Sequence, residues 1–338
     1  TQVDSRRSKL ASNKHYKFRN TDGSGPPSLI QERIRRMWTS AYLPFCTKHS
    51  PNPPLSGYRP QFSLGSYTWM GHNTVLLQLP NSLNILTDPM FSIKSYGPLL
   101  DSKTRQTLLP CRISDLPTIH VVILSNNQAE NLDLKTLATL CSQEVAPTFI
   151  VPKGLKRRLS RKLKNSHRVH IQELEWFESA FVQNTEIVFT PSKYWTGSSF
   201  LDYNKSLWGS FAVLTPTTKI FYVGDTGQSD DFKTITRFFE TKYPESFSGF
   251  DLSLLPIGSC YFSKPIAPYN ITPLQAVQAH QDLKSKNSVG IRWGTFQHPS
   301  EPWDGFARRL NLIMHTKPTV APFTAAVLGK TVPIPLAL

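Results

Sequence analysis

The sequence predicts an α/β fold in which two sheets lie between helices, preceded by an extended N-terminal arm. Within residues 61–338, short apolar runs of strand length alternate with helical patterns. Residues 1–60 are polar and contain several prolines, ending in the run SPNPP at 50–54, which is typical of an extended arm. The 338 residues are 39% hydrophobic, enough for one large domain with a substantial core. No apolar run approaches the roughly 18 residues that a membrane-spanning helix needs.

One short helix is expected in the arm at 30–38. The first half of the domain is expected to contain several strands, a helix and a basic segment. Clusters of β-branched and large apolar residues between turn residues predict strands at 74–79, 84–87, 119–124 and 149–151. Asp133 is expected to cap a helix that runs to Leu140.

The second half of the domain is also expected to contain both strands and helices. Strands are expected at 186–190, 210–214, 219–223, 252–255 and 289–293. Thr272 followed by Pro273 predicts the N-cap and first turn of a helix through Lys286. A further helix is expected at 303–314.

The net charge of +15 is concentrated in two segments. Residues 1–36 hold nine Lys and Arg against three acids, a net charge of +6, and residues 153–168 hold eight and no acid, a net charge of +8. Leu155, Leu159 and Leu163 are spaced to form an apolar stripe on a helix that carries the cations on its other face. Such localised charge favours a polyanionic partner, either nucleic acid or an anionic membrane surface. The candidate contacts are Lys153, Lys156, Arg157, Arg158, Arg161, Lys162, Lys164 and Arg168, with Arg6, Arg7 and Lys9 in the arm.

The four cysteines lie far apart, without the paired spacing of a disulfide framework or a thiolate zinc site. Their reduced form, in a reducing compartment, is the simpler expectation.

A series of ordered motifs resembles the N-acylphosphatidylethanolamine-hydrolysing phospholipase D family, a branch of the metallo-β-lactamase fold. The resemblance extends from about Tyr67 to Leu310, and it implies a four-layer αβ/βα sandwich with a dinuclear zinc site at the edge of the two sheets. The motifs are Trp69-Met70-Gly71-His72, Leu86-Thr87-Asp88-Pro89, Gly97-Pro98, Ile113-Ser114-Asp115-Leu116-Pro117, Val151-Pro152-Lys153-Gly154-Leu155, Glu173-Leu174-Glu175-Trp176, Thr190-Pro191-Ser192, Leu207-Trp208-Gly209-Ser210, Gly224-Asp225-Thr226-Gly227, Leu255-Pro256-Ile257-Gly258 and Trp293-Gly294-Thr295-Phe296.

The metal ligands implied by this resemblance are almost all replaced. The loop that carries the pattern His-x-His-x-Asp-His in active members here reads NNQAEN over residues 126–131. Only Asp225 is unchanged, and Glu130 is the only other plausible ligand. The positions that correspond to metal ligands are Asn126, Gln128, Glu130, Asn131, Tyr194, Asp225 and Arg292, and a substrate-side histidine corresponds to Asn270.

Zinc needs three or four imidazole, thiolate or carboxylate donors per ion, and neutral amides are weak zinc donors. Arg292 adds a permanent cation where a dication is implied. We therefore expect neither metal, cofactor nor catalytic residue at this site. Two stranded carboxylates are costly unless they are paired, so Arg292 is expected to form a salt bridge with Asp225 and Glu130.

Other candidate residues receive structural interpretations. His72 is expected to make structural hydrogen bonds, and Asp88 to hold loops through backbone hydrogen bonds. Ser125 has no nearby histidine in sequence and is not a convincing nucleophile. His167 and His170 are expected to be exposed polar residues.

Three functions remain open at this point. The first is a non-catalytic structural or RNA-contacting subunit of a larger assembly, specifically a mitochondrial ribonucleoprotein such as the mitoribosome. The second is a lipid-binding pseudoenzyme that recognises anionic membrane surfaces. The third, least favoured, is a hydrolase with altered chemistry in which Glu130, Tyr194 and Asp225 act as acid/base groups. The expected partner is a large protein or RNA-protein assembly, with an anionic membrane surface as the alternative, and no small-molecule substrate is expected.

Overall fold

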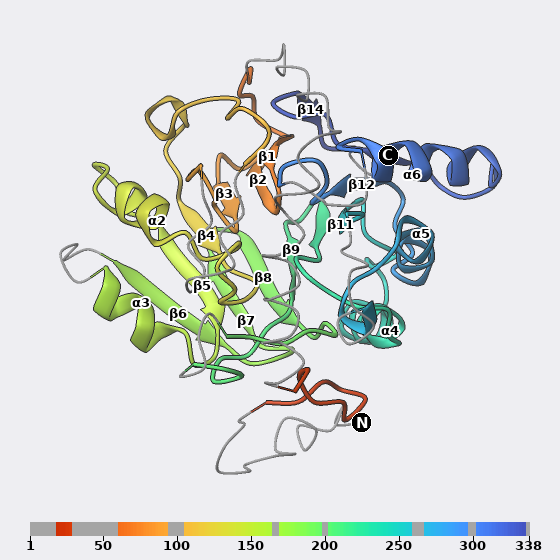
Figure 1. The fold of residues 1–338 in the computed structure, drawn as a ribbon, viewed down its shortest axis with the longest axis horizontal. Helices are drawn as coiled ribbons and strands as arrows, with labels where there is room; N and C mark the ends of the chain where they lie inside the picture. Colours follow the sequence, from red (N-terminus) through yellow and green to blue (C-terminus); the bar gives the residue numbers. More distant parts are fainter. Residues whose placement is uncertain are drawn as a thin grey trace.

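Two seven-stranded sheets form the centre of the protein in the computed structural model (Figure 1). The structure describes residues 18–28, 60–93, 105–163, 169–197, 202–258, 267–296 and 302–335. The helix expected at 30–38 lies outside them.

The first sheet joins antiparallel strands near the start of the domain to parallel strands that follow them. Strands β1, β2 and β3 pair antiparallel, whereas β3 to β6 pair parallel. In spatial order the strands are β14 (Thr331–Pro333), β1 (Ser66–Gly71), β2 (Thr74–Gln78), β3 (Asn84–Thr87), β4 (Val121–Ile123), β5 (Thr148–Pro152) and β6 (His170–Leu174).

The second sheet has the same mixed character. Strands β7 to β10 pair antiparallel, and β10 to β13 pair parallel. In spatial order the strands are β13 (Phe323–Ala325), β12 (Ser288–Ile291), β11 (Leu252–Pro256), β10 (Lys219–Tyr222), β9 (Ser210–Leu214), β8 (Thr185–Thr190) and β7 (Ser179–Val182).

Helices cover the outer face of each sheet, which produces four layers. One apolar cluster fills the space between the sheets, with side chains from β1 to β6 and from β7 to β12. A second cluster joins the first sheet to α2 (Leu134–Cys141) and α3 (Lys156–Lys162). A third joins the second sheet to α4 (Asp231–Lys242), α5 (Pro273–Asp282) and α6 (Gly305–His315). The predicted α/β sandwich is therefore confirmed. Among the described residues, no helix combines the length and the apolar composition needed to cross a membrane.

Local capping chemistry explains where helices α2 and α5 begin. The Asp133 side chain accepts a hydrogen bond from the Thr136 backbone and caps α2, as expected. Thr272 and Gln275 form a reciprocal capping box at the start of α5, with Pro273 in its first turn. Leu155, Leu159 and Leu163 are buried, which confirms the apolar stripe of α3.

Several boundaries differ from the sequence-based expectation. Helix α5 ends at Asp282 rather than Lys286, because Lys284 has a φ of 51° that no right-handed helix accommodates. The strand expected at 289–293 ends at Ile291, since the next residue, Arg292, has a φ of 64°. Helix α4 and strands β1, β6, β7, β13 and β14 were not anticipated.

His280 of α5 is buried between that helix and the second sheet. Its Nδ1 lies 2.7 Å from the Ser288 hydroxyl, and its ring stacks on Phe323 with centroids 5.6 Å apart. Burial lowers the pKa of His280 from 6.5 to about 4, although a hydrogen bond with the Ala321 backbone acts in the opposite direction. The neutral imidazole is thus the form that this core accepts.

This burial predicts a loss of stability in mild acid. Because the folded-state pKa is depressed, the unfolded chain takes up a proton between about pH 6.5 and pH 4 that the folded protein does not. The stabilisation is complete above pH 6.5, and from this group the free energy of unfolding should fall by about 2 kcal/mol between pH 7.5 and pH 5. Urea unfolding at the two pH values, with His280→Gln beside the wild type, measures it. The exposed His170 provides the control: His170→Gln should retain the full pH dependence, and a His280→Gln variant that also retains it would contradict the prediction.

Candidate functional site

Loops at the strand ends converge on one side of the sandwich to form the site. The segment 125–133 follows β4, 191–197 follows β8, 223–228 follows β10, and Arg292 follows β12. Two glycines allow these loops to approach one another closely. A Cβ on Gly224, which has a φ of 67°, would lie 2.6 Å from the Ser125 Cβ. A Cβ on Gly258 would lie 2.2 Å from the Arg292 carbonyl oxygen.

The Asp225 carboxylate is the centre of this site and is 3% exposed. Three asparagine amides donate to it: Asn73 Nδ2 to Oδ1 at 3.1 Å, and the Nδ2 atoms of Asn126 and Asn131 to Oδ2 at 3.1 and 2.5 Å. The structure therefore brings together two replaced ligand positions and the retained aspartate. Donation by three amides satisfies the hydrogen-bonding capacity of this buried carboxylate.

Arg292 bridges the two carboxylates of the site. Its Nε forms an ion pair with Asp225 Oδ1, close in distance but without the alignment of a hydrogen bond. Its Nη2 donates to Glu130 Oε1 at 2.9 Å, and its Nη1 donates to the Gly258 carbonyl at 3.1 Å. The side chains of Arg292, Asp225 and Glu130 are 9%, 1% and 14% exposed. The expected salt bridge is confirmed with both acids.

The backbone at Arg292 is unusual for a side chain of this size. Its φ of 64° places it in the left-handed region, where residues other than glycine are uncommon. Its backbone N–H donates to the His72 carbonyl at 3.0 Å, and His72 in turn donates its N–H to the Thr295 hydroxyl at 2.6 Å. The hydrogen bonds of His72 thus support the structural role expected for it, through its backbone.

The residues present do not fit the dinuclear zinc centre that the resemblance implies. The side-chain oxygens of two replaced ligand positions are already engaged: Asn126 Oδ1 accepts from the Gln128 backbone at 2.8 Å and from Asn131 Nδ2 at 3.1 Å. Asn131 Oδ1 accepts from Asn73 at 2.9 Å. The two carboxylates face a guanidinium that stays protonated. No step of a reaction can therefore be assigned to a metal held by this donor set.

The Gln128 side chain and two further replaced positions, Tyr194 and Asn270, have other surroundings. Gln128 Nε2 is buried without a hydrogen-bond partner among the described residues. Tyr194 is 4% exposed and packs against Trp195 with ring centroids 4.5 Å apart. Asn270 follows a short 3-10 helix, Ala267–Tyr269, and its N–H donates to the Ala267 carbonyl at 3.3 Å.

Asp88 is the centre of a second buried polar group, next to the network around Asp225. Its carboxylate accepts from the Ser125 backbone at 2.7 Å, the Ser125 hydroxyl at 2.5 Å and the Tyr222 hydroxyl at 2.5 Å. Burial raises the pKa of Asp88 to about 7, whereas these hydrogen bonds act to lower it. The loop-holding role expected for Asp88 is confirmed by the Ser125 backbone contact. Ser125 donates its hydroxyl to this acid, an arrangement that positions the loop.

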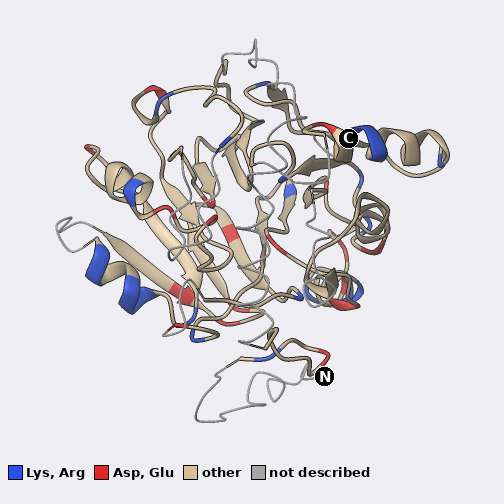
Figure 2. Cartoon of the chain, in the orientation of Figure 1, with Lys and Arg blue, Asp and Glu red and all other residues tan. Residues whose placement is uncertain are grey.

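Acidic residues from elsewhere in the chain lie beside the basic segment after β5 and offset part of its positive charge. Lys153 forms an ion pair with Glu175, and Arg158 forms one with Asp202. The Lys156 backbone donates to Glu173 at 2.6 Å. Acids from β6 and the loops beside it therefore offset part of the charge, as the red end of that strand beside the blue helix α3 indicates (Figure 2).

Four cations of α3 remain exposed without an ion-pair partner within the described residues: Lys156, Arg157, Arg161 and Lys162. They lie on the face opposite the buried leucines and form one blue edge of the molecule in Figure 2. Lys164, Arg168, Arg6, Arg7 and Lys9 lie outside the described residues.

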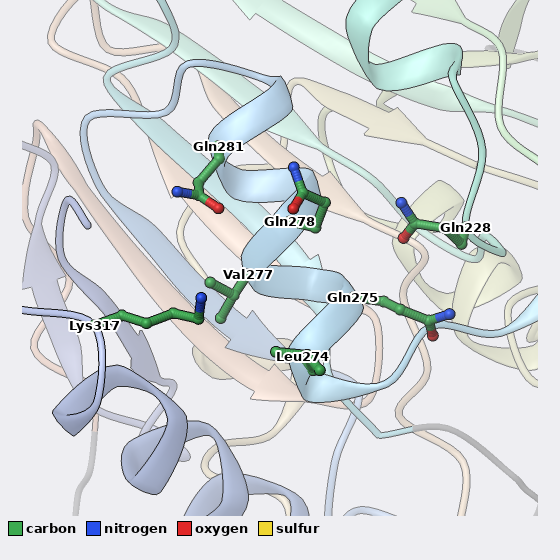
Figure 3. A pocket seen from close by; sticks show the side chains of 7 residues that line it. All are labelled: Gln228, Leu274, Gln275, Val277, Gln278, Gln281 and Lys317. Carbon is green, nitrogen blue, oxygen red and sulfur yellow. The ribbon is translucent and has the colours of Figure 1, made fainter. Parts of the chain in front are cut away.

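A cleft of about 270 Å³ lies along α5, lined by Gln275, Gln278 and Gln281 with Lys317 opposite them (Figure 3). The other lining residues are Gln228, Leu274 and Val277. Its polar groups are amides and one ammonium group, so the lining offers no acid/base pair and no metal ligand of the usual kinds.

Comparisons with known proteins identify the family. The model of the "Beta-lactamase superfamily domain" matches residues 83–293. An uncharacterized protein of Mycobacterium tuberculosis is 30% identical over 300 residues, which cover 87% of this chain and 77% of that protein. The mitochondrial N-acyl-phosphatidylethanolamine-hydrolyzing phospholipase D of Saccharomyces cerevisiae is 34% identical over 239 residues, covering 68% of this chain and 47% of that protein.

A solved structure has the same fold. Igni18, a metallo hydrolase from the archaeon Ignicoccus hospitalis, superposes with a TM-score of 0.56 at 16% identity, covering 79% of this chain and 97% of the other. At that identity the similarity concerns the fold alone. The family match and the mycobacterial and yeast relatives together show that this chain belongs to the beta-lactamase superfamily, with the metallo-β-lactamase fold and homology to the N-acyl-phosphatidylethanolamine-hydrolysing phospholipases D.

Proposed function

We propose that this protein is a non-catalytic member of its superfamily, in which an internal ion-pair network takes the place of the metal centre. The observation that carries this proposal is the bridge from Arg292 to Asp225 and Glu130. A guanidinium between the two carboxylates supplies the positive charge that they need, and it cannot polarise a bound water as a metal does.

The same bridge weighs against a hydrolase with altered chemistry. Both carboxylate oxygens of Asp225 are already engaged by Arg292 and three amide donors, so neither is free to contact a substrate. Glu130 is paired with the same guanidinium, and Tyr194 lies in an aromatic cluster. None of the three candidate acid/base groups is poised for proton transfer.

RNA is the partner that we favour, within a larger ribonucleoprotein assembly. The support is the row of exposed cations on α3, which is rigidly held because its leucine stripe is buried against the first sheet. Lys and Arg on such a surface neutralise phosphates of the nucleic acid backbone. A mitochondrial location, and thereby a mitochondrial ribonucleoprotein such as the mitoribosome, is supported by the mitochondrial designation of the yeast relative.

A lipid-binding role is the second candidate, favoured by the relatives whose names specify hydrolysis of a phospholipid. Anionic lipid headgroups would attract the same exposed cations.

Charge reversal on α3 tests the RNA proposal. A triple variant with Arg157→Glu, Arg161→Glu and Lys162→Glu should weaken RNA binding at least about tenfold, and should lower the salt dependence, the slope of log Kd against log salt concentration, by about 2. Arg158 is left unchanged because its ion pair with Asp202 holds the helix to a neighbouring loop. Fluorescence anisotropy with single-stranded RNA between 50 and about 300 mM salt measures both quantities.

The matched control reverses three exposed cations elsewhere, Lys233 and Arg237 on α4 and Arg308 on α6, with the same change in net charge. Lys233 and Arg308 pair with exposed or half-buried acids at the ends of their own helices, and such pairs contribute less than about 1 kcal/mol to stability. This control should retain RNA affinity to within a few-fold. Equal losses in both variants would indicate non-specific attraction by net charge and overturn the α3 assignment. Sedimentation with anionic vesicles, impaired only in the α3 variant and without any RNA binding by the wild type, would favour the lipid candidate.

A further inference from the structure

Residues 18–28, red in Figure 1, are held against the domain by side chains that form hydrogen bonds with their backbone. Three side chains of the domain, which is called the body below, donate hydrogen bonds to backbone carbonyls of this segment. Asn204 Nδ2 donates to Phe18 at 2.5 Å, the Tyr269 hydroxyl to Gly25 at 2.6 Å, and the Tyr203 hydroxyl to Pro27. Hydrogen bonds to backbone carbonyls, combined with side-chain anchors, are one way in which proteins bind peptides.

Asn20 is the anchor of the segment and is 5% exposed. Its Oδ1 accepts from the Tyr194 backbone at 3.0 Å and from Trp208 Nε1 at 3.1 Å. Its own backbone and amide close a turn with Ser24, and Gly23 supplies the φ of 80° that this turn requires. The turn presents Asn20 to the body in a fixed geometry, so little conformational entropy remains to be lost on docking.

An ion pair and apolar contacts complete the interface. Asp22 pairs with Lys193 at 2.8 Å, and Thr21 donates to Asp231. The Phe18 side chain packs on a buried aromatic cluster. The members of this aromatic cluster are Tyr194, Trp195, Tyr203, Trp208 and Tyr269.

The loops that contact the segment contain three buried polar atoms that are not paired. Trp195 Nε1, Asn204 Oδ1 and Ser206 Oγ are buried and have no hydrogen-bond partner within the described parts of the chain. Their residues are 3%, 0% and 2% exposed. Buried polar groups are normally paired, and leaving one unpaired costs about 1–3 kcal/mol. Residues 18–28 leave this cost unrelieved in the loops that hold them.

Chain connectivity does not force the segment into place. The 31 residues from 29 to 59 separate it from the domain, and that length can span roughly 100 Å. The contacts of residues 18–28 therefore have to supply their own affinity, as those of a tethered ligand do.

We propose that the loops 192–197, 202–208 and 267–269 form a docking site for a peptide that carries a turn, and that residues 18–28 of this chain occupy this site. The site recognises an asparagine at the anchor position and an acidic residue two positions later. It also forms hydrogen bonds with backbone carbonyls before and after these two residues. It lies over elements that carry two of the replaced positions, Tyr194 and Asn270, so the mouth of the former active site has acquired a peptide-binding role. The proposal is independent of any RNA contact made by α3.

Cleavage of the full-length chain tests whether the segment behaves as a ligand. A specific protease site is inserted between residues 40 and 50, the folded protein is cleaved, and the two fragments are passed through a size-exclusion column. The N-terminal fragment should remain bound to the wild-type body, and a fluorescent synthetic peptide of residues 16–30 should exchange with it. In the Asn20→Ala protein the fragment should dissociate at least about tenfold more readily, because two hydrogen bonds are lost.

Arg19→Ala is the matched control, since the Arg19 side chain is exposed and its contact lies within the segment itself. It should retain the fragment as the wild type does, and thermal melting of each cleaved body establishes that the body is folded. Three results would overturn the proposal: a wild-type fragment that leaves at once, an Asn20→Ala fragment retained as tightly as the wild type, or a fragment that departs only when the body unfolds. The last would make residues 18–28 an integral part of the fold.

Discussion

Replacing Arg292 with methionine should lower the free energy of unfolding by about 3–5 kcal/mol, because the change leaves two buried carboxylates without a counter-charge. Methionine preserves much of the side-chain volume, so the loss reports charge rather than a cavity. The guanidinium contacts both Asp225 and Glu130, whose side chains are 1% and 14% exposed. Some loss will also arise from the Gly258 carbonyl, which accepts from Arg292 Nη1. Urea unfolding at neutral pH measures the change.

Neutralising the acids should rescue the same variant. A triple variant with Arg292→Met, Asp225→Asn and Glu130→Gln removes the stranded charges and should regain at least about half of the lost stability. Arg308→Met is the control for a surface ion pair: Arg308 is 61% exposed and pairs with Asp304 one helical turn away, so its loss should cost less than about 1 kcal/mol. An Arg292→Met protein as stable as the Arg308→Met protein would show that the network does not stabilise the fold.

Local sequence signals predicted the parts of the fold that depend on neighbours in the chain. The cap at Asp133, the capping box at Thr272 and the strands β2, β3 and β9 depend on residues within a few positions of one another. Helix α4 was missed although its side chains Phe232, Ile235 and Phe239 follow a helical spacing. The ends of α5 and β12 were placed too late because positive φ at non-glycine residues has no reliable sequence signal.

Only those residues of the candidate site that correspond to ligand positions of the family motifs could be predicted from the sequence. Positions 126, 131, 225 and 292 were expected to lie together, and the structure brings them together around one carboxylate. Asn73 was missed because its contacts with Asn131 and Asp225 join residues 58 and 152 positions apart. Its only sequence signal is its place directly after the Trp69–His72 motif. The docking of residues 18–28 was missed for the same reason, since a polar arm gives no indication of what it contacts.

Restoring the family's ligand pattern should produce a site that binds about two zinc ions per chain, whereas we expect the wild-type protein to take up no stoichiometric zinc. The loops already hold positions 126, 131 and 292 around Asp225, as their contacts with its carboxylate demonstrate. Imidazoles placed there would face the retained aspartate. The restored variant carries Asn126→His, Gln128→His, Glu130→Asp, Asn131→His, Tyr194→His and Arg292→His. Elemental analysis of purified, dialysed protein gives the zinc content, and calorimetry with zinc gives the affinity.

The matched control keeps Arg292 and carries the other five substitutions. In this variant the guanidinium still pairs with Asp225 and remains cationic, so it both occupies a ligand carboxylate and repels an incoming dication. We expect its zinc affinity to fall below that of the full set by at least about a hundredfold. Equal zinc binding with and without Arg292 would contradict the role assigned to that residue, because the ion pair would then yield to metal without cost. Stoichiometric zinc in the wild-type protein would contradict it more directly, since the amide oxygens and both carboxylates would have to exchange their present partners for the metal.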